Sequence, residues 1–224
     1  MEESKVRLLR VTHKPSDRKY TIPVYDQAAS AADFQKIRLD NDAPIVSLDP
    51  GYLNTACCKS SITYIDGEGG NLLYRGYNIA DLVKNCSFLE VAYLLIFGQL
   101  PSEDEYDEFE SNIMLHSTLH VDTTKLLQSF RYDAHPMGMF VSGTAALSAY
   151  YPEGNPYVCG NARLYKEDRD ICLRQIYRCL GKIPSLAACA YRHKIGRAYN
   201  SPGTGLGYTE NFLYMLDRLS EPDF

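Results

Sequence analysis

The chain has 224 residues, 45% of them hydrophobic and 23% charged, which is enough apolar surface to bury a sizeable core. A net charge of −5 disfavours nucleic acid as a partner. No stretch approaches the roughly 18 consecutive apolar residues of a membrane span, so we expect no membrane partner either. Seven cysteines without a Cys-x-x-Cys pair predict reduced thiols in an intracellular protein.

The first forty residues predict a small β-hairpin followed by a short helix. Two apolar-alternating runs, Val6 to Val11 and Tyr20 to Tyr25, flank a stretch with the Pro, Ser and Asp of a turn. Ser30 stands where a helix N-cap is expected. We therefore take residues 1–40 as an N-terminal segment with its own hairpin and helix.

Residues 41–82 predict an irregular segment and a second hairpin. Pro44 and Pro50 disfavour helix in the residues before them. The sequence "SITYIDGEGGNLLYRGYNIADL" then places two strand-like runs around a glycine-rich turn and ends in a helix start. A phosphate cradle is disfavoured here, because no Lys-Ser/Thr follows the glycines and Asp66 and Glu68 would repel phosphate. We expect Arg75 to tie the hairpin to neighbouring backbone or to an acid.

Residues 83–224 show helical periodicity and predict a mainly α fold. Ser87 and Glu90 have capping-box spacing, and Gly98 stands at a C′ position. A second helix starts at Ser102, with an acidic first turn that the helix dipole favours. Further helices are predicted over residues 122–130, 136–151, 166–192 and 206–219. On the longest, the helical spacing of Cys172, Ile176, Cys179, Leu180 and Ile183 predicts a buried stripe.

Candidate sites outside these elements have ordinary explanations. His116 and His120 lie four apart and would share a helical face, but no third metal ligand stands near them, so no metal site is predicted. His135 precedes a helix and is interpreted as a satisfied polar histidine. Residues 163–197 carry nine Lys or Arg against three acids, which indicates a solvated helix face or a surface for an anion.

Four ordered blocks nevertheless resemble one family. They are "LDPGYLNTACCKSSITYIDGEGGNLLYRGYNIADL", "LEVAYLLIFGQLPS", "DAHPMG" and "YTENFLYMLD". Together they resemble the N-terminal part of citrate synthase, closest in pattern to eukaryotic peroxisomal or glyoxysomal and bacterial hexameric-type enzymes. The resemblance implies a multi-helical fold, of which residues 83–224 would be part of the large domain. The rest of that domain and the small domain would lie outside these residues.

The resemblance also implies an activity, the condensation of acetyl-CoA with oxaloacetate and water to citrate and CoA. It implies acetyl-CoA as a substrate, no further cofactor, and assembly as a homodimer or higher oligomer. In the family, two histidines and an aspartate carry the acid, base and oxyanion roles that such a condensation needs. None of the family's catalytic or substrate-binding positions matches a residue here, so we expect this chain alone to be inactive.

One regulatory site is implied by the bacterial hexameric enzymes, which bind NADH. Three of its positions match His116, Arg178 and Lys182, whereas the arginine before the histidine is Leu115 here. A pyrophosphate needs several cations at once, so the replacement weakens the match. Ordinary surface charges are the alternative interpretation.

Two other functions are compatible with the sequence. A non-catalytic paralogue or regulatory subunit would assemble with an intact citrate synthase, and 2-methylcitrate synthase would use propionyl-CoA with the same N-terminal pattern. We expect a cytoplasmic or peroxisomal location, since no targeting signal is visible.

Overall fold

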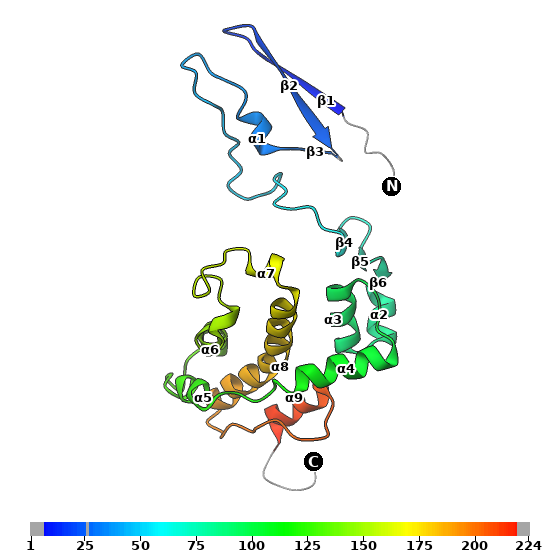
Figure 1. The fold of residues 1–224 in the computed structure, drawn as a ribbon, viewed down its shortest axis with the longest axis vertical. Coiled ribbons are helices and arrows are strands. Elements are labelled where there is room, and N and C mark those ends of the chain that lie inside the picture. Colours follow the sequence, from blue (N-terminus) through cyan, green and yellow to red (C-terminus); the bar gives the residue numbers. More distant parts are fainter. Residues whose placement is uncertain (1–6, 26, 219–224) are drawn as a thin grey trace. The chain divides into compact units, whose positions relative to one another are not determined.

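The computed structural model describes residues 7–25 and 27–218 (Figure 1). The polypeptide groups into two compact units, divided between Ser61 and Ile62. The predicted fold class is confirmed, because the second unit is mainly helical and the sheets are small and antiparallel. The finer boundaries at residues 40 and 82 stay a prediction. No helix in the described part of the chain is long and apolar enough to cross a membrane.

The first unit contains the predicted hairpin. Strands β1 (Arg7–His13) and β2 (Arg18–Tyr25) pair antiparallel, and β3 (Ala28–Ala29) adds to β2. Helix α1 (Ala31–Phe34) follows Ser30, whose side chain makes no capping hydrogen bond. The core of the unit rests on Ile22 and Ile37, both buried. Val6, at the start of the predicted first strand, lies outside the described residues.

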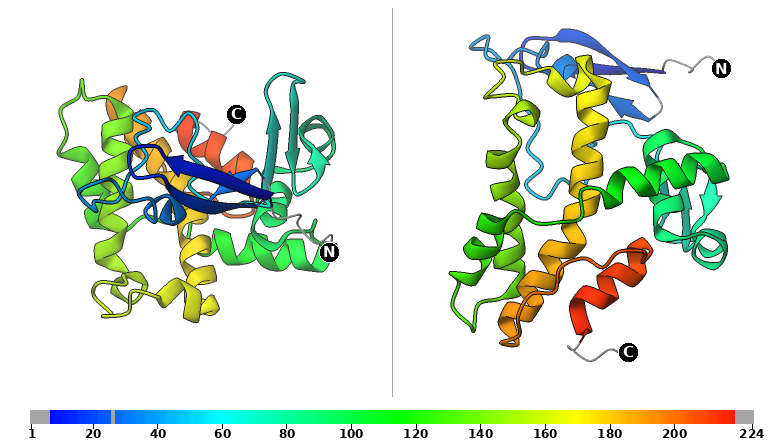
Figure 2. Two further views of the ribbon diagram at one scale, coloured as in Figure 1. Left: turned by 90° about the horizontal axis from the view of Figure 1, so that it is seen from above. Right: turned by 60° about the horizontal axis from the view of Figure 1, so that its bottom comes forward.

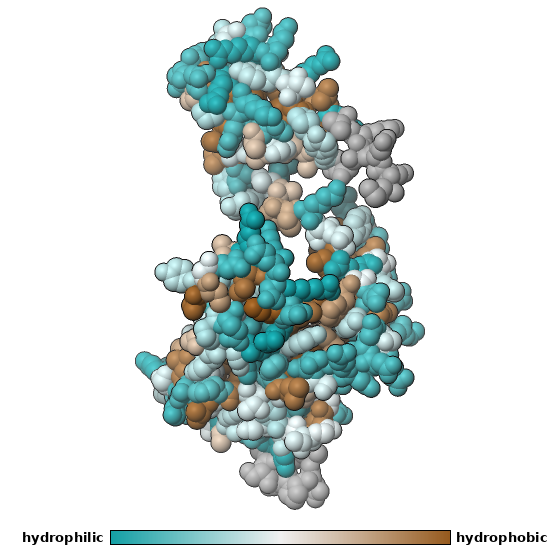
Figure 3. Space-filling view, in the orientation of Figure 1, coloured by the Kyte–Doolittle hydropathy of each residue, from teal (hydrophilic) through white to brown (hydrophobic). Residues whose placement is uncertain are grey.

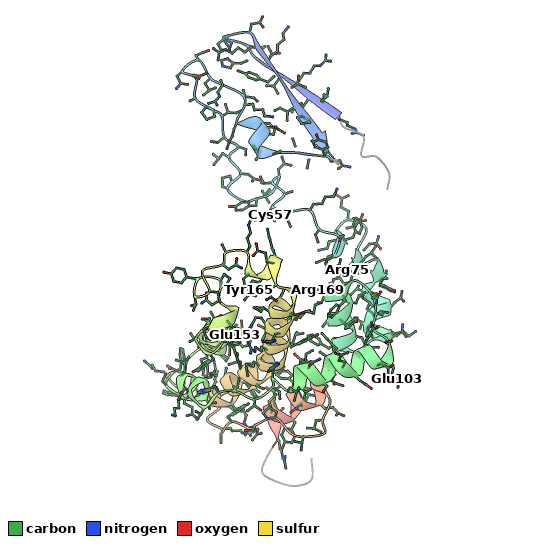
Figure 4. The ribbon with its side chains drawn as sticks, viewed as in Figure 1. Cys57, Arg75, Glu103, Glu153, Tyr165 and Arg169 are labelled. Carbon is green, nitrogen blue, oxygen red and sulfur yellow. The ribbon has the colours of Figure 1, made fainter. Side chains whose placement is uncertain are left out.

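The second unit begins with the other predicted hairpin. Strands β4 (Thr63–Asp66), β5 (Asn71–Tyr74) and β6 (Tyr77–Asn78) form one antiparallel sheet. Asp66 Oδ1 accepts the Gly69 N–H at 2.9 Å, and Gly70 has φ +68°, so this cluster forms a turn. Arg75, labelled in Figure 4, donates from Nη2 to the Leu95 carbonyl at 2.8 Å, so it ties the hairpin to neighbouring backbone, as the sequence predicts.

The helices after the hairpin begin where their caps predict. The first three are α2 (Ile79–Asn85), α3 (Phe88–Phe97) and α4 (Glu103–Met114). Complete capping boxes start α3 at Ser87 and Glu90 and α4 at Ser102 and Glu105. Gly98 closes α3 in the left-handed region, at φ +91°.

The remaining elements correct two predictions. They are α5 (Val121–Gln128), α6 (Pro136–Tyr150), the 3₁₀ turn η1 (Pro152–Gly154), α7 (Leu164–Glu167), α8 (Arg169–Lys194) and α9 (Tyr208–Asp217). Because α4 ends at Met114, His116 and His120 do not share a helical face. The helix predicted from residue 166 is interrupted at Asp168, whose side chain accepts the Ile171 N–H and starts α8. Leu219, the predicted end of the last helix, lies outside the described residues.

Helix α8 is the centre of the helical unit. It packs against α4, α5, α6 and α9, and the two views of Figure 2 show α6 alongside it. The predicted stripe is wrong, because Cys179 is exposed and Ile183 is 37% exposed. Burial instead concentrates in the second half of the helix, where Leu186, Cys189 and Ala190 join a core with α5 and α6.

Two residues of α8 depart from ordinary helix chemistry. Gly181 lets α8 approach α4 closely, since a Cβ there would lie 2.4 Å from the Ile113 carbonyl oxygen. Pro184 has no N–H, so the Leu180 carbonyl lacks its usual donor within the helix. The Tyr208 hydroxyl donates to that carbonyl at 2.8 Å and thereby ties α9 to α8.

Candidate functional site

A cavity of about 470 Å³ lies between the end of α4 and the first half of α8. His116, in the turn after α4, lines it together with Arg174 and Arg178, which lie four apart on one face of α8. The other lining residues are Asn112, Asp170, Leu173 and Tyr177. The cavity lining thus carries two guanidinium groups and an imidazole but only one carboxylate, that of Asp170. This balance of charge favours an anionic ligand.

The Arg178 side chain is held in place on the η1 side of α8. Its Nη1 donates to Glu153 Oε1 at 2.6 Å, and its guanidinium carbon lies 4.0 Å from the centre of the Tyr151 ring. The hydrogen bond from Arg178 holds the pKa of Glu153 below its ordinary value. Figure 4 labels Glu153 on η1, beside α8. The arginine is therefore ordered without a ligand, which lowers the entropy lost on binding one.

The surroundings of His116 disfavour protonation of its imidazole. Burial lowers the pKa of His116, and the charges of Arg178, Lys182 and Arg174 lower it further. An anion in the cavity would oppose these charges and favour the protonated ring. Anion binding and proton uptake at His116 are thus expected to be coupled.

Lys182 has a different position from the other two predicted residues. Its side chain is buried, and Nζ donates to the carbonyls of Thr118 at 2.7 Å and His116 at 3.2 Å. It is not among the residues that line the cavity. The lysine therefore fixes the turn that carries His116, while Leu115, where the resemblance expects arginine, is 77% exposed.

A second cavity, of about 370 Å³, adjoins Arg178 on the side of α6 and η1. Arg178 and Gln175 both line it, and within the described structure Arg178 Nε and Gln175 Nε2 are buried without a hydrogen-bond partner. Buried donors normally have an acceptor. The two groups could bind a water or an oxygen of a ligand.

The other histidines have local structural contacts. His120 and His135 start α5 and α6, where their Nδ1 atoms accept the N–H groups of Asp122 and Met137. His193 Nε2 lies 2.9 Å from the Phe130 carbonyl oxygen. The interpretation of His135 as a satisfied residue agrees with this geometry. In the described part of the chain, no group of three His, Cys, Asp or Glu side chains is placed to hold a metal ion.

Sequence reasoning missed Arg174, Asn112 and Gln175 as cavity residues. Arg174 could have been found, because it precedes Arg178 and Lys182 at spacings of four and eight on one helix. Asn112 and Gln175 give no such signal, since their place depends on how α4 and α8 pack.

Comparisons with known proteins connect the chain to one family. The family profile "Citrate synthase, C-terminal domain" matches residues 51–223. A citrate synthase from Dictyostelium discoideum is 49% identical over 221 residues, and a peroxisomal citrate synthase from the same organism is 47% identical over 223. These alignments cover 98% and 99% of the chain but only 43% and 45% of the relatives.

A solved structure agrees with the sequence matches. The crystal structure of citrate synthase from Pyrobaculum aerophilum superposes with a TM-score of 0.68 at 31% identity. It covers 80% of this chain, and this chain covers 44% of it. The chain thus spans less than half the length of the relatives it matches.

Proposed function

Because the chain belongs to the citrate synthase family, we propose that it is part of a protein that condenses acetyl-CoA with oxaloacetate and water to citrate and CoA. The observation that carries the proposal is 49% identity over 221 residues with a Dictyostelium citrate synthase. We place this chain in the N-terminal part of such an enzyme. Within these 224 residues no catalytic residue is assigned, so the activity is proposed for the whole protein.

The test compares two proteins. The 224-residue chain and a full-length protein that contains it are purified, and CoA release is followed with acetyl-CoA and oxaloacetate. The proposal expects CoA release from the full-length protein only. A full-length protein that folds and binds neither substrate would favour the non-catalytic subunit, whereas a preference for propionyl-CoA would favour 2-methylcitrate synthase.

We also propose that the chain assembles, either with itself as a dimer or with a full-length subunit. Citrate synthases are generally oligomeric, and α2 and α3 expose apolar side chains that an isolated monomer would leave in water. Val83 is 76% exposed and Phe88 57%, and both line an apolar groove of about 580 Å³. Figure 3 shows apolar patches between hydrophilic areas on the helical unit. Light scattering on the purified chain tests this, and a stable monomer at micromolar concentration would contradict it.

For the location of the protein we propose the peroxisome or the cytoplasm. The support is the similarity to a peroxisomal citrate synthase from Dictyostelium. Fluorescence of the tagged full-length protein, compared with a peroxisomal marker, tests the choice.

A second proposal concerns the cavity of His116. We propose that it binds a nucleotide or another polyanion that regulates the enzyme, with His116, Arg174 and Arg178 as ligands and Lys182 as the residue that positions the turn. The support is the two arginines that line the cavity with His116, of which Arg178 is held in place by Glu153 and Tyr151. Binding should strengthen as pH falls, because protonation of His116 adds a positive charge.

The binding test uses NADH as the probe and its fluorescence as the signal. Arg174→Gln should weaken binding at least about tenfold, since one charge-assisted hydrogen bond contributes about 1.5–3 kcal/mol. Arg169→Gln is the matched control, because Arg169 lies on the same helix but does not line the cavity. Equal binding by both variants and the parent chain would contradict the proposal.

A further inference from the structure

Two adjacent thiols lie together on the surface of the first unit. Cys57 and Cys58 are both exposed, in the irregular segment before β4, and their sulfur atoms are 3.9 Å apart. In a regular strand the side chains of successive residues point to opposite faces. Here the backbone brings both sulfurs to the same side. Figure 4 labels Cys57 on this segment.

The pair differs from the exposed Cys159 and from the buried Cys189. Cys159 is also exposed, but its sulfur lies 3.4 Å from the carbonyl oxygens of Pro152 and Glu153, and none of the other described thiols contacts it. Cys189 is buried. Within the described residues, Cys57 and Cys58 are thus a pair whose two sulfurs can reach one ligand atom together.

A disulfide is an unfavourable product for this pair. Adjacent Cα atoms are about 3.8 Å apart across a trans peptide, whereas disulfide-bonded residues usually have Cα atoms about 4.4–6.8 Å apart. Closing the bond would therefore strain the segment and give a disulfide that is readily reduced. An atom bridging the two sulfurs forms a larger ring and avoids this strain.

The proximity of the two thiols also makes Cys58 a weaker single nucleophile. The hydrogen bond with Cys57 and the charge of the Cys57 thiolate raise the pKa of Cys58, which disfavours the nucleophilic thiolate at that residue. A ligand that gains from binding both sulfurs at once is favoured over a reagent that modifies one.

The number of protein ligands that an atom needs decides which sulfur-binding atom suits this pair. A structural zinc ion needs four ligands, and no group of three metal-binding side chains is found in the part of the chain that the structure describes. A monosubstituted trivalent arsenical brings its own third substituent and needs two soft sulfur ligands from the protein. Its geometry therefore matches a site that offers two thiols and no more.

We propose that Cys57 and Cys58 form a two-sulfur binding site for monosubstituted trivalent arsenicals. The step is a condensation without oxidation: R–As(OH)₂ and two thiols give R–As(S–Cys)₂ and two waters. Two As–O bonds break, two As–S bonds form, and the two thiol protons leave in the water. Because both groups are solvent-exposed, the reaction needs no change in the folded units.

The test uses phenylarsine oxide on the purified 224-residue chain with intact-mass detection. We expect the mass of the chain to increase by one phenylarsenic group minus two hydrogens. This adduct should persist in excess 2-mercaptoethanol and be removed by 2,3-dimercaptopropanol. Cys57→Ser and Cys58→Ser should each lose this monothiol-resistant adduct. Cys159→Ser, the matched exposed cysteine, should keep it.

Three outcomes would overturn the proposal: no adduct on the parent chain, a resistant adduct that persists in Cys58→Ser, or its loss in Cys159→Ser. Circular dichroism of every variant controls for folding. The substitutions lie at exposed positions outside helices and strands, so an unchanged spectrum is expected.

Discussion

Removal of one hydroxyl group, by Tyr208→Phe, tests the link between α9 and the proline of α8. The Tyr208 hydroxyl supplies the hydrogen bond that Pro184 cannot give to the Leu180 carbonyl. The ring itself should stay in place, because it stacks on Phe88 at 5.3 Å between centroids and 4° between planes. The variant therefore changes the hydrogen bond and little else.

The expected loss follows from what could replace the hydroxyl. A buried carbonyl left without a donor costs about 1–3 kcal/mol. The cavity bordered by Pro184 and Tyr208 has a volume of about 10 Å³, at the lower limit for one water. We therefore expect the free energy of unfolding to fall by about 2 kcal/mol, a Tm loss of about 4–8 °C for a chain of this size.

Urea and thermal unfolding, followed by circular dichroism, measure this loss. The control is Pro184→Ala, which restores a backbone N–H four residues after Leu180. In that background Tyr208→Phe should cost clearly less, so the double-mutant cycle should give a coupling energy of at least about 0.5 kcal/mol. Burial raises the pKa of Tyr208 to about 12, so the donor is intact and the result should not change between pH 6 and 9. Additive effects of the two substitutions would show that the Tyr208 hydroxyl does not compensate for the N–H that Pro184 lacks.

Two further predictions concern the contact of α4 with α8 and the pH dependence of stability. Gly181→Ala should destabilise the chain by about 1–3 kcal/mol in the same unfolding assay, because the new Cβ would meet the Ile113 carbonyl oxygen. The control is Gly138→Ala, where a Cβ would have open space, and this variant should be neutral or stabilising. The pKa of His116 is lowered on folding from 6.5, so the unfolded chain binds more protons and stability should fall as pH drops below 6.5. His116→Gln should flatten that slope in urea unfolding at pH 5 to 7, and an unchanged slope would contradict the assignment.

Local hydrogen-bonding patterns made much of the fold predictable. Ser87 with Glu90 and Ser102 with Glu105 fix helix starts within four residues, and both starts are confirmed. The turn at Asp66 and Gly70 was predictable for the same reason, since its chemistry is complete within the turn. Such features need no knowledge of the remaining chain.

Features that depend on packing between helices were not predictable. The sequence does not show that α4 stops at Met114, because the turn after it is held by Lys182 from another helix. The exposure of Cys179 and Ile183 likewise follows from which side of α8 meets α4, α6 and α9. In the candidate site, the sequence predicts His116 and Arg178 at one site, and both line the cavity. Lys182 does not line it and instead holds the turn that carries His116.

The most direct test of the account is an activity measurement on the 224-residue chain, purified and verified by intact mass. CoA release is followed with acetyl-CoA and oxaloacetate, beside a full-length protein that contains the same residues. We predict CoA release by the full-length protein and none above background by the 224-residue chain. Turnover by that chain alone would show that catalytic groups lie within these residues and would contradict the account.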